Sequence, residues 1–280
     1  MIGQLKARYI SKSCPYELST RRFQVFRWDI VGQYLFSGLF ISAAWTTLWI
    51  AVISQTCGVI IGLFLALMRM SRYPWLSLPA RAYIWLFRGS PLLVQLLLLY
   101  FGFPEVFPGL VPYITIYSAA LIAFSFNEGA YMAEIIRAGI TSVDPGQMEA
   151  AKSLGMRYAL AMRRVILPQA ARVIVPPLGN EFNNMLKTTS LASVIGLFEL
   201  TYTAQVYGSQ SFSYFELLIV ATFYYLILTT LWGYIQSYIE RRLDPNRLTG
   251  SELKAQKSWT QRMMGFGTRG DRLVGPRELR

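Results

Sequence analysis

Long apolar segments constrain this chain more than any other feature of its sequence. The clearest, residues 46–68, contains no charged side chain. A bilayer core about 30 Å thick is crossed by a helix of about 20 apolar residues. Hydrophobic residues make up 54% of the 280 residues and charged residues 15%, against about 25% in a soluble domain. The sequence therefore predicts an all-α integral membrane protein, and it excludes a disordered chain or a disulfide scaffold.

Five segments are candidate membrane spans, and they differ in polarity. The second is interrupted by Arg88-Gly89-Ser90-Pro91, and the fourth carries the most polar residues. An amphipathic stretch over residues 28–45 is expected to lie at the membrane interface before the first span. The expected spans are 46–68, 83–103, 113–136, 172–197 and 215–239.

The basic residues are divided unevenly by these spans. Six lie in the N-terminal tail on one side, twenty lie on the other side, and Lys187 falls within a span. Because cytoplasmic loops carry the excess of Lys and Arg, this count predicts an outside N-terminus and a cytoplasmic C-terminus. The six basic residues of the tail argue against that orientation. A sixth crossing or a re-entrant N-terminal piece is the alternative.

The residues that are missing narrow the function. The chain has no histidine, which removes His-based metal sites and His general bases. It has no G-x-x-x-x-G-K-[ST] loop, so we expect no ATP hydrolysis on this chain. The net charge of +12 is attributed to membrane orientation rather than to nucleic-acid binding. We therefore expect no catalytic residue, no metal and no cofactor on this chain.

A short capped helix is predicted between the third and fourth spans. Asp144 suits the N-cap, Pro145 suits the first helical position, and Gln147 could reach back as in a capping box. Gly155 is expected to end the helix, because glycine accepts the left-handed conformation. A second helix is expected to follow and to break near Pro168. The first helix either connects two spans at the protein surface or binds a partner protein that moves it.

Several spaced motifs resemble one family. Glu149-Ala150-Ala151, Gly155, Val165 and Leu167-Pro168 resemble the EAA loop of ATP-binding-cassette importer permeases, here over residues 144–168. That family usually has Ile at the place of Val165. Further stretches resemble its polar amino-acid branch (histidine, glutamate, glutamine, arginine or opine type), which often has an acidic residue at the place of Thr188. They read RGSPLLVQ (88–95), EIIRAGI (134–140), LPQA (167–170), NEF (180–182) and KTTSL (187–191).

The resemblance covers residues 34–243 and implies a fold and an assembly. It implies a five-span type I importer core with a cytoplasmic coupling helix between spans three and four. The basic tails, 1–33 and 244–280, lie outside it. A second permease subunit, two ATPase subunits that bind ATP and Mg, and an extracytoplasmic amino-acid-binding protein would complete the importer in the cytoplasmic membrane of a prokaryote. The residues expected to dock on the ATPase are Glu149, Ala150, Ala151, Leu154 and Gly155.

The fourth span is the candidate substrate pathway. Ionisable groups at membrane depth are costly and usually face a bundle interior or an aqueous path. Pro176-Pro177 and Gly179 suggest an interrupted helix of the kind that lines substrate sites. Lys, Thr and Ser side chains could donate to an amino-acid carboxylate, and Glu and Asn oxygens could accept from its ammonium group. The candidates are Asn180, Glu181, Asn184, Lys187, Thr188 and Ser190.

Structural alternatives remain for the polar residues of the spans. Those of span four could satisfy one another, join helices through hydrogen bonds, or lie at a subunit interface or gate. Asn127, Glu128 and Glu134 favour solvated or capping roles, and Arg88 favours a surface anchor. Gly58 to Gly62 is a small-xxx-small pattern that indicates close helix packing.

Two functional alternatives also remain open. One is a permease for another small solute, such as methionine or an osmolyte. The other is a secondary transporter, which would carry intramembrane charges but would respond to an ion gradient instead of an ATPase.

Overall fold

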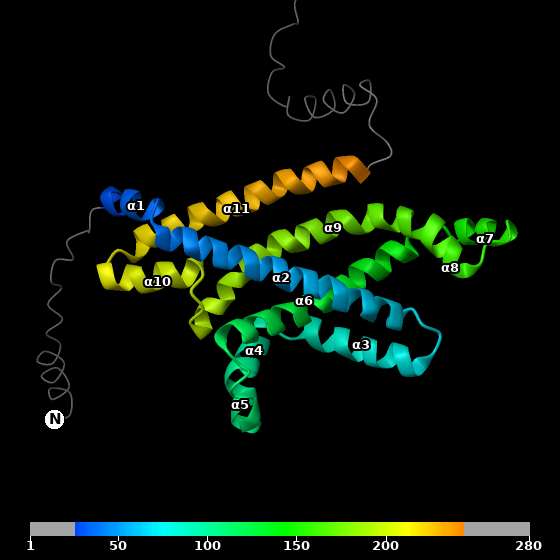
Figure 1. Ribbon diagram of the computed structural model, residues 1–280, viewed down its shortest axis with the longest axis horizontal. Coiled ribbons are helices and arrows are strands. Elements are labelled where there is room, and N and C mark those ends of the chain that lie inside the picture. Colours follow the sequence, from blue (N-terminus) through cyan, green and yellow to red (C-terminus); the bar gives the residue numbers. More distant parts are fainter. Residues whose placement is uncertain (1–25, 244–280) are drawn as a thin grey trace, which may run out of the picture. The chain divides into compact units, whose positions relative to one another are not determined.

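A computed structural model describes residues 26–243, and within that range the chain is helical without a β-strand. Most of the predicted N-terminal tail and the whole C-terminal tail lie outside the described residues. The α-helices are labelled in Figure 1. They are α1 (Trp28–Leu35), α2 (Gly38–Arg69), α3 (Pro74–Gly89), α4 (Leu92–Leu97), α5 (Phe103–Val106), α6 (Ile116–Thr141), α7 (Pro145–Ser153), α8 (Tyr158–Ala161), α9 (Leu167–Thr188), α10 (Leu200–Ser211) and α11 (Tyr214–Leu243).

Helices α2 and α11 are each long and apolar enough to cross a membrane. They correspond to the first and fifth predicted spans, and each extends beyond them. The second predicted span, 83–103, is not one straight helix. Helix α3 ends at Gly89, and the chain bends by 102° before it continues from Leu92 to Val106. Pro91 accounts for the break, because proline lacks an N–H and disfavours helical backbone in the residue before it.

The third and fourth predicted spans are also helical. Helix α6 covers most of 113–136 and continues to Thr141, and α9 is followed by a 3₁₀ segment, Thr189–Ile195, over the rest of 172–197. The expected interruption at Pro176-Pro177 is wrong, since α9 runs through both prolines. The region after Leu197, expected as a loop, contains α10. Its start is capped by Glu199, whose carboxylate accepts a hydrogen bond from the Tyr202 N–H.

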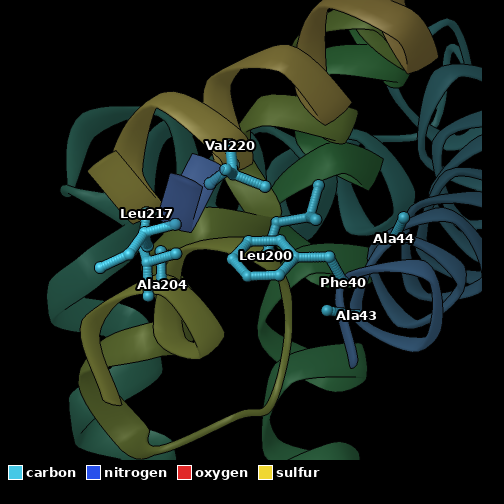
Figure 2. Close-up of a cluster of buried hydrophobic side chains, with 9 residues drawn as sticks. Phe40, Ala43, Ala44, Leu200, Ala204, Leu217 and Val220 are labelled. Carbon is cyan, nitrogen blue, oxygen red and sulfur yellow. The ribbon is translucent and has the colours of Figure 1, made fainter. Parts of the chain in front are cut away.

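The described chain divides into two compact units, and several helices contribute to both. The first comprises the described part of 1–57 with 89–127 and 184–229. Its core gathers side chains of α1, the start of α2, α10 and α11, as Figure 2 shows for Phe40, Leu200 and Leu217. The small residues of this cluster let the large side chains interlock. The cluster consists of Ile30, Phe40, Ala43, Ala44, Leu200, Ala204, Leu217, Val220 and Ala221.

The second unit comprises 58–88, 128–183 and the described part of 230–280. Within it, the end of α2 packs very closely on α6. A Cβ atom at Gly58 would lie 2.6 Å from Glu128 Cγ, and one at Gly62 would overlap Met132 and the backbone of Ala133. The predicted close packing at the Gly58–Gly62 pattern is therefore confirmed.

Candidate functional site

Helix α7 is the short capped helix that the sequence predicts between α6 and α9. Asp144 is its N-cap, and Asp144 Oδ1 accepts a hydrogen bond of 2.7 Å from the Gly146 N–H. Pro145 occupies the first turn, where no N–H partner is needed. The capping-box role of Gln147 is replaced by another contact, because Gln147 Oε1 accepts from Gln169 Nε2 of α9 at 3.3 Å.

The C-terminal end of α7 is closed by its own backbone. Gly155 has a φ of +78°, as predicted for a left-handed helix end. The Gly155 N–H donates to Lys152 O and the Met156 N–H donates to Ala151 O. These two bonds satisfy carbonyl groups that the end of a helix otherwise leaves free.

One face of α7 is anchored and the other is open. Ala151 is buried, and Met148 packs against a cluster formed by Ile140, Ile166 and other residues of the same unit. Glu149 and Ala150 are exposed, and Leu154 just beyond the helix is 83% exposed. The exposed residues therefore lie on the open face of α7 and at its C-terminal end. Four of the five predicted docking residues, Glu149, Ala150, Leu154 and Gly155, are thus exposed at this helix and its C-terminal end, whereas Ala151 is buried against the rest of the unit.

The segment after α7 differs from its prediction. Helix α8 is followed by a π-helical turn, Met162–Ile166, and the chain then enters α9 at Leu167. The expected break near Pro168 is wrong, because Pro168 lies in the first turn of α9. A π turn widens the helix by one residue, and this removes the clash that a proline causes in a regular helix.

The predicted pathway residues lie on α9 and just after it. Asn180, Asn184 and Lys187 are exposed, and their spacing of four and three residues is that of one helix face. Glu181 and Thr188 are partly buried, and Ser190 is partly buried in the 3₁₀ segment. Nearby, Asn183 Oδ1 is buried without a hydrogen-bond donor among the described residues. An unsatisfied buried oxygen costs about 1–3 kcal/mol.

Two side chains of α11 hold the middle of α9. Trp232 Nε1 donates to Gly179 O at 2.8 Å, and Gln236 Nε2 donates to Pro176 O at 3.3 Å. The same amide lies 3.1 Å from Asn180 Oδ1. The rings of Trp232 and Phe182 are 4.2 Å apart. Trp232 and Gln236 were not predicted from the sequence to contact another helix. The only sequence signal for such a contact is that their side chains carry polar atoms within an apolar helix.

Several polar residues expected to be solvated are not. Asn127 is buried and donates to Gln95 Oε1 at 3.1 Å, and Glu128 is buried opposite Gly58. Glu134 pairs with Arg69 and with Arg137 at 3.1 Å. Solvated or capping roles are therefore wrong for these residues. Arg69 comes from the end of α2, and Arg137 comes from α6 itself.

Glu199 was not singled out by the sequence. It is fully buried in the first unit, and its second oxygen accepts a hydrogen bond of 2.6 Å from Tyr225 Oη. Tyr225 Oη also lies 3.1 Å from Thr201 Oγ1. With the Tyr202 N–H on its other oxygen, this carboxylate is enclosed by neutral donors. Such an arrangement fixes the start of α10.

The chain matches a known family. The family described as binding-protein-dependent transport system inner membrane component matches residues 58–245. The arginine transport system permease protein ArgU of Corynebacterium glutamicum is 39% identical over 258 residues, covering 85% of this chain and 79% of that protein. The L-cystine transport system permease protein TcyB of Bacillus subtilis is 41% identical, covering 78% of this chain and 91% of that protein.

Solved structures support the same fold. An amino acid ABC transporter crystallised with histidines contains a chain that is 47% identical, with a TM-score of 0.66. The match covers 73% of this chain and 94% of that one. A chain of the MetNI methionine ABC transporter in an inward-facing conformation is 18% identical, with a TM-score of 0.62, covering 74% of this chain and 96% of that one. The second likeness shows the fold alone.

Proposed function

Because this chain belongs to the family of binding-protein-dependent transport system inner membrane components, we propose that it is the transmembrane permease subunit of an ATP-driven importer for polar amino acids. The observation that carries the proposal is the combination of this family with relatives named for arginine, octopine and cystine transport. These named substrates are amino acids or an opine, each with charged or polar groups. The alternative of an ion-coupled secondary transporter has no comparable support.

The coupling site of this permease is α7. An ATPase subunit docks on the exposed side of Glu149, Ala150, Leu154 and Gly155, while Ala151 anchors the helix from the opposite side. The caps at both ends make α7 a rigid unit. A displacement of α7 by the ATPase is therefore transmitted to α9 through the hydrogen bond between Gln147 and Gln169. ATP and Mg are bound by that partner. Movement of α7 then alternates the access of the pathway between the two sides of the membrane.

The substrate pathway follows α9. Asn180, Asn184 and Lys187 offer exposed polar groups, and Glu181, Thr188 and Ser190 offer partly buried ones. A zwitterionic amino acid needs donors for its carboxylate and acceptors for its ammonium group. The hydrogen-bond donors for the carboxylate are Lys187, Thr188 and Ser190. The acceptors for the ammonium group are Glu181 and the Asn side-chain oxygens. The buried Asn183 Oδ1 is a further acceptor at this level of the helix.

The assembly contains two permease subunits, two ATPase subunits and an extracytoplasmic binding protein. It lies in the cytoplasmic membrane of a prokaryote, with five spans, the N-terminus outside and the C-terminus inside. In this orientation α7 faces the cytoplasm, where ATP is available. The excess of basic residues on the same side of the membrane supports the orientation.

The test uses the full chain, co-purified with its ATPase subunits and reconstituted in liposomes with the binding protein. Radiolabelled arginine, glutamine, histidine and cystine are offered one at a time, and uptake and ATP hydrolysis are measured together. We expect uptake of one polar amino acid only when ATP is enclosed with the ATPase. Glu149→Lys reverses an exposed charge at the docking face, and it should lower uptake at least tenfold while the assembly partly dissociates.

Asp29→Lys is the matched control, because it reverses an exposed acidic charge on α1, far from α7 in the sequence. It should keep uptake within twofold. Normal transport by Glu149→Lys would refute the role of α7. Uptake that needs an ion gradient and persists without ATP would refute the importer and support a secondary transporter.

A further inference from the structure

Three arginines from three helices lie around one glutamate in the second unit, and a fourth lies two turns away on one of these helices. Glu134 of α6 pairs with Arg69 at the end of α2 and with Arg137 one turn further along α6. Arg88 of α3 lies 3.9 Å from the same carboxylate, and its guanidinium lies 5.2 Å from the Tyr131 ring centroid. Arg81 lies two turns before Arg88 on the same face of α3. We name these five residues the arginine cluster.

The arginine cluster carries far more positive charge than its carboxylate can neutralise. Glu134 is the shared partner of Arg69, Arg88 and Arg137, and Arg81 forms no ion pair among the described residues. Glu134 is 19% exposed, whereas Arg88 is 44% exposed and Arg137 33%. The carboxylate therefore lies inside, and the guanidinium groups form an open rim. Like charges held this close favour the binding of an anion between them.

The exposed face of α3 shows where this rim lies relative to the bilayer. Leu78, Arg81, Trp85 and Arg88 follow a spacing of three, four and three residues, which places them on one face of the helix. All four are exposed, Leu78 by 59% and Trp85 by 76%. Tryptophan and arginine alternating on one helix face are typical of the boundary between acyl chains and headgroups. Arg69 ends the apolar α2 at the same cluster.

We propose that the arginine cluster binds the phosphate of an anionic lipid headgroup, with its acyl chains along Leu78 and Trp85. Guanidinium groups suit this ligand, because their planar fork makes paired hydrogen bonds to phosphate oxygens. A free phosphate would bind the same arginines, but it would leave the exposed apolar side chains of Leu78 and Trp85 without a partner. The site therefore selects a ligand that has both an anionic group and an acyl chain.

The experiment measures lipid retention by the full chain in complex with its ATPase subunits, using native mass spectrometry. The complex in mild detergent receives equal amounts of phosphatidylglycerol and phosphatidylcholine with the same acyl chains. We expect phosphatidylglycerol to be retained in preference to phosphatidylcholine. Arg81→Gln should weaken this preference about fivefold, and adding Arg88→Gln should weaken it about fivefold more, from about 1 kcal/mol for each exposed guanidinium–phosphate ion pair that is lost.

Arg72→Gln is the matched control. Arg72 is exposed, precedes the same helix, and lies over the Tyr73 ring at 5.2 Å instead of facing Glu134. Its loss should change the preference less than twofold. Arg81→Gln remains informative even if the double variant does not fold, because Arg81 is exposed and outside the ion pairs of Glu134.

Two results would overturn the proposal. One is equal retention of the two lipids by the wild type, or a preference that Arg81→Gln leaves unchanged. The other is release of phosphatidylglycerol by 10 mM inorganic phosphate, which would assign the cluster to a free anion instead of a lipid. Persistence of the lipid in that phosphate, with its loss in Arg81→Gln, supports the lipid site.

Discussion

Helices α7 and α9 are near neighbours in the sequence, yet different forces hold them. The two ends of α7 are fixed by groups next to them in the chain, which are the Asp144 carboxylate at the start and the backbone bonds from the Gly155 and Met156 N–H groups at the end. The middle of α9 is fixed by Trp232 and Gln236, which come from α11 more than fifty residues later. A capping interaction between neighbouring residues can be predicted from the sequence, whereas a hydrogen bond from a distant helix becomes visible only in the folded chain.

Two glycines show the same difference at single positions. Gly155 needs its left-handed backbone, with a φ of +78°, but a Cβ atom there would meet nothing within 4 Å. Gly179 has no such backbone requirement, but a Cβ atom there would lie 2.6 Å from Gln236 Cδ and 2.9 Å from Gln236 Nε2. The first glycine is required by conformation and the second by space. Substitutions should therefore fail for different reasons.

The largest effect is expected from Gly179→Leu. The new side chain displaces Gln236, so that Pro176 O and Asn180 Oδ1 lose their donor, and overpacking of this kind costs about 1–3 kcal/mol. We expect the melting temperature of the detergent-solubilised complex to fall by several degrees and uptake to fall with it. Gly233→Leu on α11 is the control, since a Cβ atom there meets nothing within 4 Å. Equal melting of the two variants would contradict the close contact.

Trp232→Phe tests the same contact more gently. Phenylalanine keeps a ring near Phe182, but it removes the donor to Gly179 O, a hydrogen bond worth about 1 kcal/mol. Melting should shift less than in Gly179→Leu. Trp75→Phe removes an indole from a side chain that is 70% exposed, and it should leave melting unchanged. If Trp75→Phe were the more damaging change, the hydrogen bond from Trp232 would not be what stabilises α9.

The accuracy of the sequence predictions follows this division between local and long-range effects. The ends of α7 were predicted from Asp144, Pro145 and Gly155, because capping depends on residues within one turn. The Gly58–Gly62 pattern also predicted close packing, since small residues four apart let another helix approach the backbone. In the first case neighbouring residues decide the structure, whereas in the second they predict close packing without naming α6 as the partner helix.

The predictions that failed concern partners from elsewhere in the chain. Proline suggested breaks at Pro168 and Pro176 that the structure does not have, because a π turn relieves the first and α9 remains helical through the second. Glu134 was expected to be solvated, but its partner Arg69 comes from another helix. Glu199 gave no sequence signal, since the neutral Tyr225 that satisfies it lies 26 residues away. The residues next to Glu134 and Glu199 in the sequence do not indicate that Arg69 and Tyr225 will be their partners.

On the α7 side of the comparison, Asp144→Ala should act locally. Loss of an N-cap side chain costs about 1 kcal/mol, and here it frees the Gly146 N–H. We expect amide hydrogen exchange in the first turn of α7 to become about fivefold faster. The melting temperature of the whole complex should stay within error, because α7 is anchored elsewhere by Ala151. Asp144→Asn keeps a capping oxygen and should restore most of the protection.

The smallest effect is expected from Gly155→Ala, and it isolates conformation from space. A left-handed backbone costs an L-residue about 1–2 kcal/mol, part of which is recovered because alanine has less freedom than glycine in the unfolded chain. Since no neighbour lies within 4 Å of the new Cβ atom, no packing cost is added. Gly155→Asn should be tolerated better than Gly155→Ala, because asparagine enters the left-handed region more readily. The measurement compares amide hydrogen-exchange rates at the end of α7 in the two variants, Gly155→Ala and Gly155→Asn. The amides measured are those of residue 155 and Met156. Identical exchange in the two variants would mean that backbone conformation does not limit this position, and that its glycine serves the approach of a partner to α7.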